Sequence, residues 1–130
     1  MADLHGVIVY EIIESASWLV LNGVYANVTT SHVHSGLFNE IAKRDLKIKV
    51  DEQNPANPND PHLDPDDILM GTYAVTYIDA GKFDGKLIIT RGHETYKLDW
   101  IINGKPWFTG IGIRVGNHLS VSYTGVLKKQ

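Results

Sequence analysis

Two histidines stand two residues apart, at His32 and His34, and imidazole nitrogen is a common metal ligand in proteins. Side chains at positions i and i+2 of a β-strand point to the same face, so this pair could share one metal ion. Such a site needs a third ligand, and the spacing of the other histidines does not select one. The simpler interpretation is two polar residues at the end of a strand. A metal-dependent enzyme using His32 and His34 is therefore one hypothesis for the function.

The segment 51–67 combines prolines with carboxylates, which calcium accepts as ligands. It holds four of the five prolines, six acidic residues and no basic residue. The carboxylates, Asp67 among them, lack the alternating spacing of an EF-hand loop, and Asn-Pro and Asp-Pro pairs favour turns. Because proline cannot donate a backbone hydrogen bond, we predict a long loop here without a bound cofactor, inside a single domain of residues 1–130.

Aromatic residues of the C-terminal half form the candidate ligand site. They share alternate positions with aliphatic residues such as Leu98 and Val121, and this period of two places them on the inner face of a sheet. A buried tyrosine or tryptophan needs a hydrogen-bond partner, which is backbone in a filled core and can be a ligand in a barrel with a cavity. The predicted ligand-binding residues are Tyr73, Tyr96, Trp100, Trp107 and Tyr123.

The elements that position these side chains are predicted to be strands. Between Gly71 and Gly125 five short alternating runs follow one another at a spacing of roughly 11 residues, with glycine turns, which is typical of an antiparallel meander. Near the N-terminus, the β-branched residues of 7–12 favour a strand. Two further strands, 18–21 and 24–29, flank Asn22-Gly23, which is a strong signal for a two-residue hairpin turn.

One helix is predicted, over Ser35–Arg44. Leu37, Phe38 and Ile41 recur at helical spacing, and two basic residues fall in the last turn, where they suit the helix dipole. A strand over 46–50 follows it.

Two glycines, Gly110 and Gly112, are predicted to share the face opposite Ile111 and Ile113. A strip without side chains permits a sharp bend of the strand, and it could also receive another chain. A homo-oligomer joined through this strip or through strand edges is a further hypothesis.

Composition excludes several function classes. The chain has 130 residues, no cysteine and a formal net charge of −3, which disfavours nucleic acid as a partner. Glu11 and Glu14 interrupt the apolar N-terminal run, so we expect neither a targeting segment nor a membrane span, and a cytoplasmic location. We find no serine nucleophile elbow and no glycine-rich phosphate loop that opens a helix.

The C-terminal half resembles a group of small bacterial β-proteins. The resemblance rests on the motifs Y-x-V at 73–75, G-x-L-x-I at 85–89, Y-x-L-x-W at 96–100, G-x-G at 110–112 and L-x-V at 119–121. It covers less than half of the chain. More faintly, these motifs are similar to avidin- and lipocalin-like up-and-down barrels. The resemblance implies a meander barrel that binds a small apolar molecule in its mouth, and no biotin-site residue has a counterpart here.

Together these patterns predict an all-β protein, a single antiparallel up-and-down barrel or sandwich of about eight strands with one short helix. Alternation alone does not separate a barrel from a sandwich. The favoured function is non-enzymatic binding of a small, partly apolar ligand. The metal-dependent enzyme and the oligomeric interaction protein stay open as alternatives.

Overall fold

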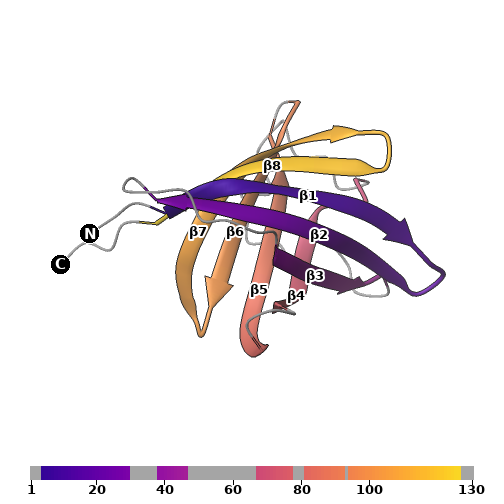
Figure 1. The fold of residues 1–130 in the computed structure, drawn as a ribbon. Helices are drawn as coiled ribbons and strands as arrows, with labels where there is room; N and C mark the ends of the chain where they lie inside the picture. The colour runs from indigo at the N-terminus through magenta and orange to yellow at the C-terminus, as the bar shows by residue number, and fades with distance from the viewer. Residues whose placement is uncertain (1–3, 30–37, 47–66, 78–80, 93, 127–130) are drawn as a thin grey trace.

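The computed structural model describes residues 4–29, 38–46, 67–77, 81–92 and 94–126 and shows one closed β-barrel. Eight antiparallel strands follow in sequence order around the barrel, and the first pairs with the last (Figure 1). The predicted antiparallel all-β fold is therefore confirmed. Of the two predicted alternatives, barrel and sandwich, the structure is a barrel. The strands are β1 (Leu4–Glu14), β2 (Trp18–Thr29), β3 (Phe38–Asp45), β4 (Gly71–Tyr77), β5 (Gly81–Arg91), β6 (Tyr96–Ile102), β7 (Lys105–Val115) and β8 (His118–Gly125).

The predicted helix over Ser35–Arg44 is wrong for its described part, because residues 38–45 form strand β3. This strand pairs with β2 and β4, so both of its backbone edges are hydrogen-bonded. Its burial has a period of two: Glu40, Ala42 and Arg44 are buried, and the residues between them are not. The polar inner residues hid this alternation. Among the described residues, none belongs to a helix with the length and apolarity needed to cross a membrane.

The hairpin predicted at Asn22-Gly23 is also wrong, since β2 runs through both residues without a break. Gly23 faces the interior directly opposite Tyr10 of β1. A Cβ atom at this position would lie 2.8 Å from two carbons of the Tyr10 ring. The glycine therefore gives room to a ring rather than making a turn. Of the strand predicted over 46–50, only Leu46 is described, and it lies just beyond the end of β3; of the loop predicted over 51–67, only Asp67 is described.

The glycines of β7 also make room for inner side chains, and they correct a further prediction. Gly110 pairs with Tyr123 of β8, and Gly112 pairs with Tyr96 of β6. A Cβ at Gly112 would meet the side chains of Leu98, Leu119 and Val121, which belong to the core. The strip therefore lies on the inner face, so it is not a surface for another chain.

The segment 67–70 closes one end of the barrel just before β4. Leu69 and Met70 are buried, and the hydroxyl of Tyr73 donates a hydrogen bond to the Leu69 carbonyl at 2.7 Å. The Arg44 guanidinium donates to the Ile68 carbonyl. These bonds satisfy backbone groups that no strand pairs, which allows irregular chain to fill the barrel end.

Candidate functional site

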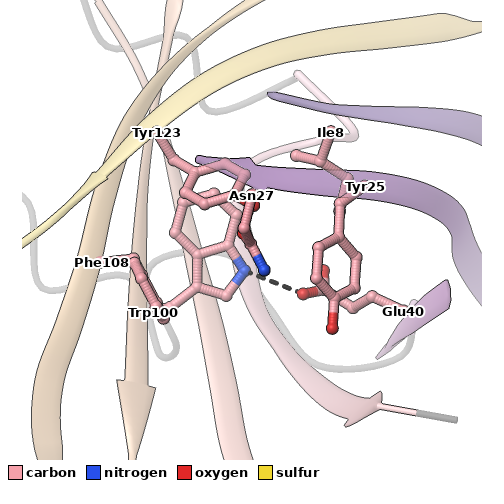
Figure 2. A pocket seen from close by; sticks show the side chains of 7 residues that line it. All are labelled: Ile8, Tyr25, Asn27, Glu40, Trp100, Phe108 and Tyr123. Atoms are coloured by element: carbon pink, nitrogen blue, oxygen red, sulfur yellow. Dashed lines mark hydrogen bonds between the residues drawn. The ribbon is translucent and has the colours of Figure 1, made fainter. Parts of the chain in front are cut away.

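A cavity of about 100 Å³ lies inside the barrel, toward the end opposite segment 67–70. It is partly enclosed, and its wall is mainly apolar. Figure 2 shows the side chains that surround it, which come from β1, β2, β3, β6, β7 and β8. The described residues that line it are Ile8, Tyr25, Asn27, Glu40, Trp100, Phe108 and Tyr123.

Glu40 is the charged residue of this wall, and its side chain enters from β3 with 2% of its surface exposed. One carboxylate oxygen accepts a hydrogen bond from the Trp100 indole N–H at 3.2 Å. The other accepts from the hydroxyl of Tyr10, a core residue beside the cavity. A buried carboxylate is costly unless it is hydrogen-bonded, so these two donors stabilise Glu40 in the interior.

Tyr123 and Asn27 form a second polar group in the wall. The Tyr123 hydroxyl donates to the Asn27 side-chain oxygen and lies 3.3 Å from the Ala26 carbonyl. Burial raises the pKa of Tyr123 above its ordinary value, and the nearby Tyr25 and Glu40 raise it further. The hydroxyl therefore stays protonated at neutral pH and acts as a hydrogen-bond donor.

The remaining wall is built from aromatic rings. The ring centroids of Trp100 and Tyr123 lie 5.6 Å apart with planes tilted by 59°, and Phe108 meets Tyr123 edge to face at the same centroid distance. Such tilted pairs hold one another in place. Trp100 and Phe108 stand on one side of the cavity, and Ile8 and Tyr25 stand on the other (Figure 2).

The size of the cavity restricts what it can hold. Pockets for drug-sized ligands begin at roughly 300 Å³, whereas an apolar cavity of about 150 Å³ is large enough to bind benzene. The cavity of about 100 Å³ is smaller than both, so it suits a molecule no larger than a single small ring. Its chemistry combines aromatic faces with one carboxylate.

The structure separates the five residues predicted to share a site. Trp100 and Tyr123 line the cavity. Tyr73 and Tyr96 are buried at the opposite end of the barrel, where they hold segment 67–70. Trp107 lies on the outer surface with 43% exposed, so its predicted inner position is wrong. The register of β6 and β7 shifts at Trp100/Ile101, and Phe108 then takes the inward position.

The opposite end holds a wide, polar depression of about 520 Å³ around Asp67. The Asp67 carboxylate accepts hydrogen bonds from Arg91 at 2.8 Å and from the Tyr96 hydroxyl at 2.7 Å, and the Leu69 N–H donates to its second oxygen at 3.0 Å. Burial, followed by the bond to Asp67, raises the pKa of Tyr96 to about 12. These groups partner one another, so Asp67 anchors segment 67–70 at this end of the barrel. The depression also contains Ile68, Glu94, Arg114 and Gly116.

Sequence reasoning missed Glu40 and the N-terminal lining residues. Glu40 was assigned to a helix, and Ile8, Tyr25 and Asn27 were not connected with the aromatic half. No alternation of polar and apolar residues marks this strand, because two of its buried positions carry Glu40 and Arg44.

His32 and His34 lie outside the described residues, so the metal hypothesis stays a prediction. Within the part of the chain that the structure describes, no three histidine, aspartate, glutamate or cysteine residues gather as metal ligands would.

Comparison of the chain with protein-family models, with curated proteins and with solved structures gives no match in any of the three. The functional argument therefore depends on the geometry of the site.

Proposed function

We propose that this barrel binds a small, partly apolar molecule in its interior cavity without converting it. The observation that carries the proposal is the composition of the wall, in which four aromatic rings and one buried carboxylate surround about 100 Å³. A closed eight-stranded barrel is wide enough to be filled by side chains or to hold one small ligand. Rings give contact area at low entropic cost, and the polar groups orient the bound molecule.

Binding of benzyl alcohol, which has one ring and one hydroxyl group, tests this function. We expect saturable binding with a change in the emission of the buried Trp100, whose ring forms part of the wall. Calorimetry gives the stoichiometry, for which we expect one molecule per chain. Native mass spectrometry of freshly purified protein adds a search for a molecule already bound.

A matched pair of substitutions locates the binding. Trp100→Leu removes an indole from the wall, whereas Trp107→Leu removes one from the outer surface. Trp100→Leu should weaken binding of benzyl alcohol, and Trp107→Leu should leave it unchanged. Phe108→Trp narrows the cavity and serves as a second interior variant if Trp100→Leu does not fold. Equal effects of the interior and exterior changes, or no saturable binding to the parent, would contradict the proposal.

A second candidate, self-association, follows from the outer wall of β7, β8, β1 and β2, which lie side by side (Figure 1). Rows of paired residues cross these strands. In one row Ile111 pairs with Ser122, which in turn pairs with Val7; in another, Ile113 pairs with Ser120, which pairs with Val9. Contiguous exposed apolar surface marks interaction sites. We name this surface the outer apolar face. Its exposed apolar residues include Val7, Val9, Val24, Ile111, Ile113 and Val115.

The occupant we infer for the outer apolar face is a second copy of this chain. Each chain carries a net charge of −3, so most approaches of two copies bring like charges together. The rows through Ile111 and Ile113 contain valine, isoleucine, alanine and serine on these four strands and no charged residue. Contact through them avoids that repulsion and buries apolar surface on both copies.

A further inference from the structure

The wall of the cavity contains a polar pair that is joined across a glycine. Asn27 of β2 pairs with Gly6 of β1, and Gly6 pairs with Tyr123 of β8, so these residues lie in one row around the barrel. A Cβ atom at Gly6 would lie 2.6 Å from the Tyr123 hydroxyl oxygen. The missing side chain therefore leaves the space through which Tyr123 reaches the side chain of Asn27.

The single hydroxyl proton of Tyr123 decides which way the Asn27 amide points. This hydroxyl lies near the Asn27 side-chain oxygen and the Ala26 carbonyl, and the second contact, at 3.3 Å, is longer than an ordinary O–H···O hydrogen bond. The proton is therefore donated to the Asn27 oxygen. Burial raises the pKa of Tyr123, so the phenol keeps this proton at neutral pH. The amide then holds its oxygen toward Tyr123 and turns its nitrogen away from it.

The Asn27 amide nitrogen is the group that this arrangement offers to a ligand. An asparagine side chain carries two N–H donors on this nitrogen. Among the residues that the structure describes, none accepts a hydrogen bond from them. In Figure 2 the nitrogen points into the space between Trp100 and Tyr25, which both line the cavity. A donor in a mainly apolar wall costs free energy unless it is hydrogen-bonded, so an acceptor on a bound molecule is favoured here.

We propose that the molecule bound in this barrel is a small ring compound with a carbonyl-type hydrogen-bond acceptor, to which the Asn27 amide donates while the ring lies among the cavity aromatics. This inference rests on the proposed function, because it names the chemical class of the molecule that the cavity takes. The cavity volume of about 100 Å³ limits that molecule to a single small ring.

Cyclopentanone and methylenecyclopentane test the inference, because the two molecules have nearly the same shape and differ at one atom. The carbonyl oxygen of cyclopentanone accepts a hydrogen bond, whereas the CH₂ group that replaces it does not. Each probe is titrated by NMR at pH 7, and the affinity for cyclopentanone is divided by the affinity for methylenecyclopentane. The difference in hydration of the two probes enters every ratio equally, so a change of the ratio between variants reports a contact with the protein.

Two asparagines of β2 supply the variant and its control. Asn27→Leu keeps a side chain of similar size without the donor, and it should lower the affinity ratio by about fivefold, as expected for one net hydrogen bond. Asn22→Leu makes the same change on the exposed outer face of β2 and should leave the ratio unchanged. In the parent, the side-chain amide protons of Asn27 should move downfield with cyclopentanone and not with methylenecyclopentane.

Equal affinity ratios for the parent and Asn27→Leu would overturn the inference. If Asn27→Leu does not fold, the amide protons of the parent decide, and the same shift with both probes overturns it. Saturable binding of both probes without dependence on Asn27 leaves a ring-binding barrel and removes only the acceptor. The absence of saturable binding for both probes and for benzyl alcohol removes the proposed function as well.

Discussion

Inner glycines opposite tyrosines recur around this barrel. Gly23 faces Tyr10 across β1 and β2, and Gly6 and Gly110 flank Tyr123 from β1 and β7. A glycine lacks the Cβ that would otherwise occupy the space above its strand, so the ring of the neighbouring strand can lie over it. This arrangement lets large polar-tipped rings fit in a narrow interior, and it aims their hydroxyl groups at Glu40 and Asn27.

Gly23→Ala should destabilise the protein, since the added methyl would lie 2.8 Å from the Tyr10 ring. Overpacking of a filled core costs about 1–3 kcal/mol, which exceeds the gain of about 0.4–1 kcal/mol from a less flexible unfolded chain. Urea unfolding measures the difference. Gly92→Ala is the matched control, because its methyl would contact Thr95 at 3.5 Å and should change stability by less than about 0.5 kcal/mol. Equal midpoints for both variants would refute the packing argument.

The raised pKa of Tyr96 predicts how the stability of the protein changes at high pH. Its pKa rises from 10.0 unfolded to about 12 folded, so the folded state binds the proton more tightly. This contribution to stability is complete below pH 10 and is lost as the pH rises through 12. Tyr96→Phe removes the hydrogen bond to Asp67 and removes the titration as well. Its destabilisation, measured by urea unfolding, should therefore be smaller at pH 11 than at pH 8. A penalty that does not change with pH would contradict this assignment.

At the scale of elements, β3 and β7 decide what faces the cavity. β3 brings Glu40 inside while Asn39 stays exposed, and the register shift between β6 and β7 turns Phe108 inward and Trp107 outward. A one-residue change of register exchanges the two faces of a strand, so small irregularities of pairing set the lining of the site.

Tryptophan emission tests the orientation of β6 and β7. Trp100 is 3% exposed, whereas Trp18 and Trp107 are each nearly half exposed. Trp107→Leu should keep a blue-shifted emission component that acrylamide quenches weakly, because Trp100 remains in the core. Trp100→Leu should lose that component, leaving emission that acrylamide quenches readily. If Trp107→Leu abolishes the protected component instead, the orientation described for β7 is wrong.

At the scale of the whole molecule, closure of the sheet removes the strand edges through which many β-proteins aggregate. The self-association that we propose would then use a face of the barrel. The outer apolar face spans four neighbouring strands and exposes branched residues on β7, with Ile111 55% and Val115 68% accessible. The proposed interior binding and the proposed exterior contact would therefore use opposite faces of the same strands.

Replacing both Ile111 and Ile113 with serine should abolish association of the chain. Light scattering on the parent should show a molecular mass that rises with concentration, and the double variant should stay monomeric. Ala74→Ser introduces serine on the exposed wall of β4, across the barrel, and should associate as the parent does. Because all three positions are exposed, stability should change little. A parent that is monomeric at high concentration would exclude this use of the face.

The sequence by itself determined the strand content of the C-terminal half and the inward position of its main aromatic residues. Alternation and turn glycines depend on neighbouring residues, so Tyr73, Tyr96, Trp100 and Tyr123 were placed in the core from local pattern alone. The turn at Asn103-Gly104 is of the same local kind: both residues have positive φ, as a two-residue hairpin turn needs.

Only the tertiary structure decided what Asn22-Gly23 and Glu40 do. The same dipeptide makes a turn at 103–104 and lies within a strand at 22–23, because Tyr10 on the neighbouring strand requires the glycine. The buried carboxylate of Glu40 accepts hydrogen bonds from Tyr10 and Trp100, which lie 30 and 60 residues away along the chain. A cavity is the space left when eight strands close, so which side chains line it depends on register and closure, and local pattern contains neither.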